Sequence, residues 1–249
     1  MKSLLHISLV LTLILGLSSC GSDDNPGLAL NFKLQYDNEP LVMFQDVTYP
    51  SGEIMQVKRV SFFVSNITVQ NAEGIASQVS EVEYIDLTDS HIDITSAEQG
   101  LTMDLGSTDL LSYDEVTFNI GLNPQQNSTV PEDYRSSSPL SRSAEYWRSW
   151  ESFIFIKLEG SIDYNQNGVT ESTESFTLHM GSDAVMRDIA IDVANSESPV
   201  EINIDVKDIF ENNNVIYDIE GGARLHTLDA PTLERMDFLA DGLAAAITQ

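Results

Sequence analysis

The sequence predicts an all-β protein, a β-sandwich of antiparallel strands with one C-terminal helix. Short apolar runs with an alternating pattern follow one another along the chain and are separated by turn residues, which is typical of strands. Only one stretch, near the C-terminus, has apolar residues convincingly at helical spacing. No internal repeat or change of composition divides the 249 residues. We therefore expect one sandwich domain over residues 28–249.

Residues 1–19 have the pattern of a lipoprotein signal peptide. Residues 4–17 are mostly apolar but are too few for a transmembrane helix, and the sequence LSSC follows, ending at Cys20. This ending resembles the lipobox of bacterial lipoproteins, which implies cleavage before Cys20 and lipid on this residue. The alternatives are an ordinary signal peptide with an incidental cysteine, or a buried free thiol. Since Cys20 is the only cysteine, no internal disulfide is expected.

Residues 20–27 form a polar tether, because Pro, Gly and Asp at this density do not build a packed element. Acidic residues directly after the cysteine resemble the surface-export signal of Bacteroidota lipoproteins. This resemblance implies a cell-envelope protein, lipid-anchored to the outer membrane and exposed on the surface. The formal net charge of −27 argues against a nucleic-acid partner and against electrostatic docking on anionic lipid.

Period-two alternation and β-branched residues predict the strands of the sandwich. The predicted strands cover residues 28–36, 41–47, 55–70, 81–87, 116–122, 189–193 and 200–206. Residues 91–95 are ambiguous, and residues 123–143, with three prolines, form a long irregular connection. Residues 207–210 fit one turn of helix. The terminal helix is predicted over residues 232–247, with Asp229 or Thr232 at its start.

Residues 146–181 predict the hairpin around which the chain is organised. Trp147 and Trp150 precede an apolar strand, an oxygen-rich loop follows, and a second strand ends on His179. The loop matches the calcium pattern D-x-[DN]-x-[DN]-G-x5-E at every fixed position. Its expected ligands are Asp163, Asn165, Asn167, Val169 through its carbonyl, Glu171 through water, and Glu174. Both flanks are strands rather than helices, so the alternative is a polar hairpin turn.

Three histidines remain after the signal peptide, at positions 91, 179 and 226, and no two of them have the spacing of a metal pair. His179 and His226 could bind copper or zinc only if the fold brings them together; otherwise each is a hydrogen-bonded histidine. No nucleophile elbow and no phosphate-binding glycine loop is present, and the many carboxylates show no paired acid and base. An enzyme is therefore not expected.

Seven segments in order carry a resemblance to a known family: LNFKLQYDNEPL, VKRVSFFVSNITV, EYIDLTD, VTFNIGL, YWRSWESFIFIKLEG, FTLHMGSD and HTLDAPTLERMDFLADGL. Together they resemble the MbnP-like family, secreted or lipid-anchored proteins related to methanobactin-associated and copper-repressible copper-binding proteins. The resemblance implies copper bound by histidines beside a tryptophan oxidised to kynurenine. By position, His179 and His226 are then ligands, and Trp147 or Trp150 is the oxidised residue. Tyr146 departs from the family, in which a histidine often stands there.

The sequence thus predicts a non-catalytic lipoprotein of the cell envelope that binds copper and carries a calcium loop. Its partners would be a metal ion, the membrane through Cys20, and a protein partner. The alternative is an interaction module that presents its loops to another protein and has lost the copper site.

Overall fold

The computed structural model describes residues 27–110, 112–171, 173–194, 196 and 198–249. The predicted signal peptide, Cys20 and the tether up to residue 26 lie outside the described residues. The last tether residue, Gly27, is already the first residue of a strand. Among the described residues, no helix is long and apolar enough to cross a membrane.

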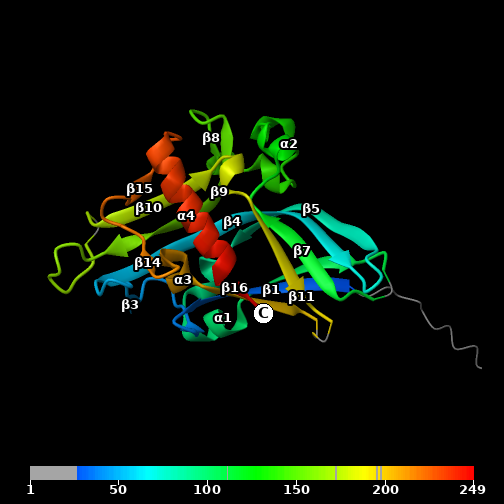
Figure 1. Cartoon of the computed structure of the whole chain (residues 1–249), viewed down its shortest axis with the longest axis horizontal. Helices are drawn as coiled ribbons and strands as arrows, with labels where there is room; N and C mark the ends of the chain where they lie inside the picture. The colour runs from blue at the N-terminus through cyan, green and yellow to red at the C-terminus, as the bar shows by residue number, and fades with distance from the viewer. Residues whose placement is uncertain (1–26, 111, 172, 195, 197) are drawn as a thin grey trace, which may run out of the picture.

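Two sheets form the sandwich (Figure 1). The larger sheet has the order β11-β7-β4-β9-β10-β15, and β3, β5 and β8 pair with strands of this path. The smaller sheet has the order β16-β12-β1-β2, with β6 paired to β1. Most pairs are antiparallel as predicted, but β1 with β12 and β10 with β15 are parallel.

The strands have the following bounds. The larger sheet contains β3 (Asp46–Thr48), β4 (Ile54–Gln70), β5 (Ala76–Asp86), β7 (Glu115–Ile120), β8 (Tyr146–Trp147), β9 (Ser152–Ile162), β10 (Ser175–Gly181), β11 (Arg187–Asp192) and β15 (Arg224–Leu225). The smaller sheet contains β1 (Gly27–Tyr36), β2 (Glu39–Pro40), β6 (Leu101–Ser107), β12 (Val200–Asp205) and β16 (Ile247–Thr248). A separate pair is formed by β13 (Glu211–Asn212) and β14 (Val215–Ile216).

The helices are α1 (Ile94–Gln99), α2 (Pro124–Asn127), α3 (Val206–Phe210) and α4 (Ala230–Ala246). The predicted terminal helix is confirmed as α4. The Asp229 side chain caps it by accepting a hydrogen bond of 3.0 Å from the backbone N–H of Thr232. The helix lies close to α3 because Gly242 has no side chain: a Cβ there would lie 2.5 Å from the carbonyl oxygen of Ile209.

The apolar core fills the space between the two sheets. Alternate residues of β1 point inward, and Leu30, Phe32 and Leu34 are fully buried. The ring of Phe32 meets that of Phe62, on β4 of the other sheet, edge to face with centroids 5.9 Å apart. Burial of such rings supplies the main favourable term in folding.

Some predicted elements differ from the structure. The strand expected over residues 41–47 is wrong for most of its length, since only Asp46–Thr48 pairs. Met43 lies in a buried loop instead, and its N–H donates to the carbonyl of His91 at 2.7 Å. Residues 94–99 form α1, capped by Asp93, and β6 was not predicted. The connection over residues 123–143 contains α2 and single turns of 3-10 helix at Pro131–Asp133 and Pro139–Ser141.

Candidate metal centre

The predicted hairpin is confirmed as β9 paired antiparallel with β10. In this register Lys157 lies opposite His179, and Glu159 lies opposite Thr177. Residues directly opposite each other share a face of the sheet, so these four side chains form one polar patch. His179 is half-buried there, and its Nε2 lies 2.7 Å from Oε1 of Glu159.

His226 reaches the same patch through β15. This strand pairs in parallel with β10, with Arg224 opposite Thr177, and His226 follows directly after it. The imidazole Nε2 of His226 lies 3.1 Å from the hydroxyl of Thr177. The rings of His179 and His226 have centroids 5.3 Å apart with an interplanar angle of 31°. The fold thus brings together the two histidines whose sequence spacing gave no metal pattern.

The two tryptophans lie beside the histidines. Trp147 and Trp150 are the ends of a turn in which the N–H of Trp150 donates to the carbonyl of Trp147 at 3.0 Å. Their rings stack with centroids 4.7 Å apart and planes 14° from parallel. The ring of Trp147 lies 4.9 Å from that of His226 and 5.8 Å from that of His179, and Trp150 Nε1 donates to the carbonyl of His226 at 3.3 Å. All four residues predicted for a copper-type site therefore form one cluster.

The electrostatics of the cluster favour neutral imidazole at His226. Burial lowers the pKa of His226 below its ordinary value, and the nearby His179 and Arg224 lower it further. The hydrogen bond from His179 lowers the pKa of Glu159, against the opposing effect of burial. Neutral imidazole is the form that binds metals.

The donor set fits a metal of the copper type. Two imidazoles that each bind one ion at about 2 Å have ring centroids no more than roughly 6 Å apart, and the observed separation of 5.3 Å satisfies this limit. His179 Nδ1 is buried and has no hydrogen-bond partner among the described residues. The described part of the chain contains no group of three or more His, Cys, Asp or Glu side chains that could hold a metal. The two imidazoles would therefore supply only part of the coordination sphere of a copper ion.

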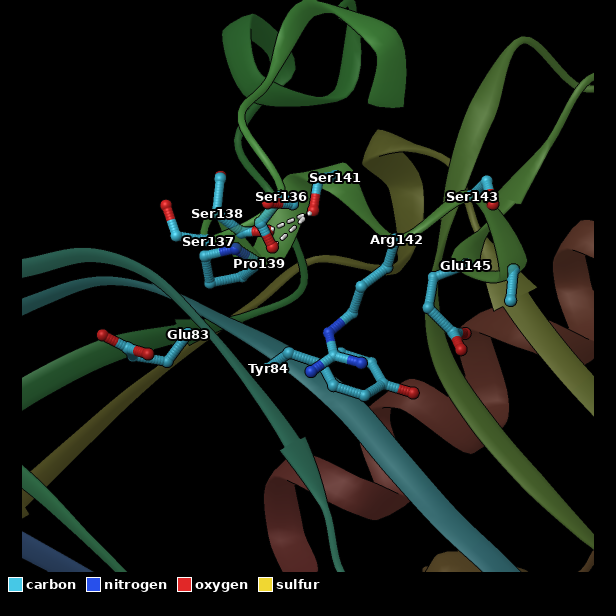
Figure 2. Close-up of a pocket in the computed structure, with 11 residues that line it drawn as sticks. Glu83, Tyr84, Ser136, Ser137, Ser138, Pro139, Ser141, Arg142, Ser143 and Glu145 are labelled. Carbon is cyan, nitrogen blue, oxygen red and sulfur yellow. Dashed lines mark hydrogen bonds between the residues drawn. The ribbon is translucent and has the colours of Figure 1, made fainter.

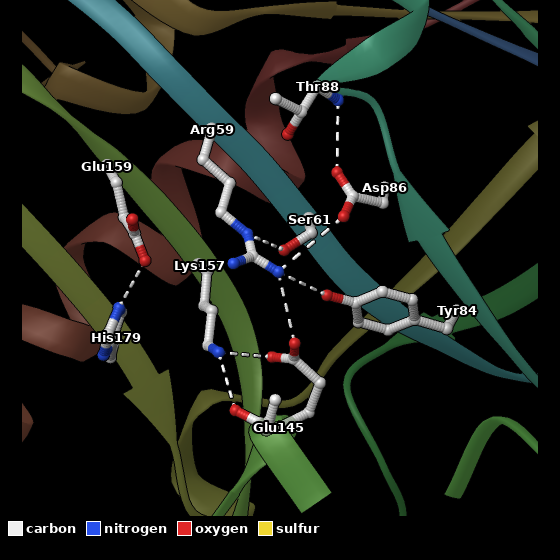
Figure 3. A network of polar contacts seen from close by, with 10 residues as sticks. Arg59, Ser61, Tyr84, Asp86, Thr88, Glu145, Lys157, Glu159 and His179 are labelled. Carbon is white, nitrogen blue, oxygen red and sulfur yellow. Dashed lines mark hydrogen bonds and ion pairs between the residues drawn. The ribbon is translucent and has the colours of Figure 1, made fainter. Parts of the chain in front are cut away.

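A buried ion network lies next to the cluster (Figure 3). The carboxylate of Glu145 contacts Lys157 Nζ at 2.7 Å and Arg59 Nη2 at 3.2 Å. Lys157 also donates to the carbonyl of Ala144 at 2.8 Å, and Arg59 reaches the hydroxyl of Tyr84 at 3.2 Å. The sequence signals for this network were two cationic residues within apolar strands, Lys157 and Arg59. Their partner Glu145 lies in an irregular segment that periodicity does not place.

Glu145 also lines a cavity of about 560 Å³ (Figure 2). The serine-rich segment from Ser136 to Ser143 forms one wall, and the guanidinium of Arg142 lies over the ring of Tyr84, 4.3 Å from its centroid. Both Arg142 and Ser143 are exposed. This cavity was not predicted from the sequence.

The predicted calcium loop lies at the tip of the hairpin, away from the imidazoles. Asp163 and Glu174 are buried at its two ends, with 2% and 8% of their surface exposed. The Asp163 carboxylate accepts hydrogen bonds from the backbone N–H groups of Asn167 at 3.0 Å and Gly168 at 2.7 Å. Glu174 Oε1 accepts from the side-chain amide of Asn165 at 2.8 Å. The two carboxylates therefore face the inside of one loop.

Two further loop residues, Asn167 and Val169, are linked by a hydrogen bond. The amide oxygen of Asn167 accepts from the N–H of Val169 at 2.9 Å, and its NH₂ group donates to Glu171 at 3.2 Å. The Val169 side chain is exposed. Ser172, within the same loop, lies outside the described residues.

Comparison with known proteins identifies a similar fold and a matching family. A solved structure, MbnP from Methylosinus trichosporium, matches with a TM-score of 0.57 and 12% sequence identity, covering 84% of this chain and 86% of that chain. At this identity the likeness concerns the fold. No curated protein matches the chain. The family model described as MbnP matches residues 25–223. Since this match covers most of the sequence, the chain belongs to the MbnP family.

Proposed function

We propose that this protein binds copper, without catalysing a reaction, through the imidazoles of His179 and His226. The observation that carries the proposal is the juxtaposition of these two rings, with centroids 5.3 Å apart and the Trp147 ring 4.9 Å from the second. Imidazole suits copper, zinc, iron and nickel, and copper(II) binds such sites most tightly of the divalent first-row metals. Copper(I) prefers the soft sulfur ligands of Cys and Met, and the predicted ligands are imidazoles, so we expect copper(II) rather than copper(I).

Elemental analysis of the purified protein after exposure to copper tests the proposal. We expect near-stoichiometric copper in the parent protein and a large loss in the His179→Ala, His226→Ala double variant. Circular dichroism would verify that the variant keeps its sheets. Equal copper content in the parent and the double variant would contradict the proposal and favour the alternative function, a protein-interaction module. A mass measurement on the peptide that contains Trp147 and Trp150 would detect oxidation of either indole.

We also propose that the hairpin tip binds calcium weakly. Two buried carboxylates at the ends of a complete calcium pattern support this second function, because hard cations take oxygen ligands from alternate residues of such loops. Asp163, Asn165, Asn167 and Glu174 would contribute side-chain oxygens, Val169 its carbonyl, and Glu171 a contact through water.

Thermal unfolding in calcium and in chelator tests this second function. Ligand at about 100 times its dissociation constant stabilises a protein by about 2.7 kcal/mol. We expect a calcium-dependent rise in melting temperature that Glu174→Gln abolishes. Glu73→Gln, which removes the same charge from an exposed turn, should keep the rise. An equal melting temperature in calcium and chelator for the parent protein would rule the calcium loop out.

The proposed location of the protein in the cell depends on Cys20. We propose that a lipid on Cys20 anchors the protein to the outer membrane, with the acidic tether favouring the outer surface. Cys20→Ala should move the protein from the membrane fraction to the soluble fraction of cells. Persistent membrane association of this variant would contradict the lipid anchor.

A further inference from the structure

Glu159 is in contact with one nitrogen of the His179 ring, and the other nitrogen has no partner. The carboxylate oxygen of Glu159 lies 2.7 Å from His179 Nε2, which is the length of a charge-assisted hydrogen bond (Figure 3). His179 Nδ1 is buried and makes no hydrogen bond to any described residue. Buried polar atoms without a partner are rare in folded proteins and call for an explanation.

The contact selects one tautomer of the ring. An ionised carboxylate only accepts hydrogen bonds, and a neutral imidazole carries one N–H and one lone pair. His179 must therefore donate from Nε2 to Glu159, which leaves the lone pair on Nδ1. The atom left free to bind a metal is thus the buried atom that lacks a partner.

The position of Glu159 is fixed by strands on both sides. In the register of the sheet, Arg59 of β4 lies opposite Glu159 on one side and Thr177 of β10 lies opposite it on the other. Lys157 precedes it by two residues on the same strand and is itself held by Glu145 at 2.7 Å. Arg59 and Lys157 therefore flank Glu159 on the same face of the sheet, and Glu159 lies on a strand that is paired on both sides.

We propose that Glu159 is a positioning residue of the metal centre: it holds His179 in the Nε2–H tautomer, so that Nδ1 binds the metal. The inference rests on the proposed metal-binding function of His179. Metal-binding histidines commonly donate their other N–H to a carboxylate, which fixes the orientation of the ring and raises its basicity. Glu159 contributes through the histidine and does not itself coordinate the ion.

The first test needs no metal. Nitrogen-15 NMR of the metal-free protein at pH 8, above the ordinary imidazole pKa of about 6.5, distinguishes the protonated from the unprotonated ring nitrogen. We expect His179 to have a proton on Nε2 and none on Nδ1. In Glu159→Gln the amide can donate as well as accept, so we expect the signals to show a mixture of tautomers. A parent protein with the proton on Nδ1 would overturn the proposal.

The second test measures copper affinity. Loss of such a carboxylate typically weakens metal binding about 10- to 100-fold, and we expect this weakening for Glu159→Gln. Glu81→Gln is the matched control, because Glu81 is exposed on β5 of the same sheet. An unchanged dissociation constant for Glu159→Gln would overturn the positioning role.

The two tests separate this inference from the proposed function. If His179→Ala lowers copper binding and Glu159→Gln does not, only the positioning role fails. If His179→Ala leaves copper binding unchanged, the metal site itself is wrong. An electron paramagnetic resonance spectrum of the copper-loaded Glu159→Gln variant that lacks one oxygen ligand of the parent protein would identify Glu159 as a ligand and overturn its role as a positioning residue.

Discussion

The imidazoles of His179 and His226 lie with ring centroids 5.3 Å apart, although one residue belongs to a long strand and the other follows a two-residue strand. The parallel contact between β10 and β15 creates this proximity. The stacked rings of Trp147 and Trp150 complete the cluster. Since the chain has only two tryptophans, all indole signals of the protein come from the candidate metal centre.

Copper(II) should therefore quench most of the tryptophan fluorescence. A paramagnetic ion bound to His226 would lie within a few ångströms of the Trp147 ring, whose centroid is 4.9 Å from the imidazole. We expect the emission to fall until copper is stoichiometric and then to stay constant. Calcium, bound at the hairpin tip, should leave the emission unchanged. Full emission from a protein that has taken up copper would place the ion elsewhere.

Gly181 allows the close approach of Trp150 to the hairpin. A Cβ at this position would lie 2.5 Å from the carbonyl oxygen of Phe153 and 3.2 Å from a ring carbon of Trp150. Gly181→Ala should therefore displace the indole and cost about 1–3 kcal/mol of unfolding free energy. The measurement is the circular dichroism couplet expected from the stacked rings, which should weaken in this variant.

The control for this prediction is Gly27→Ala. A Cβ at Gly27 would have its nearest neighbour at 3.4 Å, which is an ordinary contact. The couplet should be unchanged in that variant. An unchanged couplet in Gly181→Ala as well would show that the backbone yields and that the indole stack does not depend on this glycine.

The sequence predicted the parts of the fold that depend on local periodicity. The β9–β10 hairpin and helix α4 each follow from apolar spacing within one segment. The proximity of His226 to His179 could not be predicted in this way, because β15 has only two residues and no pattern of its own. It depends on tertiary pairing, which local spacing does not encode. The family resemblance, and not the spacing, pointed to the pair.

Residues 41–43 show why the predicted strand there is wrong. Leu41, Val42 and Met43 are all buried, which gives the segment a strand-like composition. The N–H of Leu41 still donates to the carbonyl of Leu34 on β1 at 3.0 Å, but the N–H of Met43 donates to the carbonyl of His91, at the end of a 3-10 turn, so regular strand pairing stops there. The apolar composition of a segment therefore indicates that the segment is buried more directly than it indicates a strand conformation.

Glu145 should be essential for stability because it neutralises buried Lys157. Only 5% and 7% of their side chains are exposed, and their charged atoms lie 2.7 Å apart. Removal of one partner of a buried pair typically costs about 3–5 kcal/mol, and we expect a loss of this size for Glu145→Ala in urea unfolding. The Glu145→Leu, Lys157→Met double variant should recover most of the lost unfolding free energy, because both members of the buried pair are then apolar and neither leaves the other as an unpaired charge.

An exposed ion pair provides the comparison. Glu132 also pairs with an arginine, Arg148, but both side chains are mainly in solvent. Glu132→Ala should leave the unfolding midpoint almost unchanged, because exposed pairs contribute little. A similar small effect for both alanine variants would mean that water reaches Lys157 and that the network is not a stabilising element.

His91 should make the protein sensitive to mild acid. Its ring is fully buried, accepts a hydrogen bond from the N–H of Leu34 at Nε2 (2.9 Å) and donates from Nδ1 to the carbonyl of Leu87 (3.0 Å). Burial lowers the pKa of His91 below its ordinary value of 6.5. Above pH 6.5 the folded and unfolded states both hold a neutral ring. As the pH falls below 6.5, His91 binds a proton in the unfolded state but not in the folded state, so the unfolding free energy decreases.

Urea unfolding at pH 7.5, 6.5 and 5.5 measures this loss. One such group changes the unfolding free energy by up to about 1.4 kcal/mol per pH unit between its two pKa values. His91→Gln should be less stable at pH 7.5, because glutamine cannot satisfy both backbone groups in the same geometry, but its stability should fall less on acidification. The pKa of His226 is lowered as well, so His226→Gln serves as the matched comparison. If the parent and His91→Gln lose the same free energy between pH 6.5 and 5.5, the acid sensitivity has another origin, because the buried ring would then not be the group that takes up the proton on unfolding.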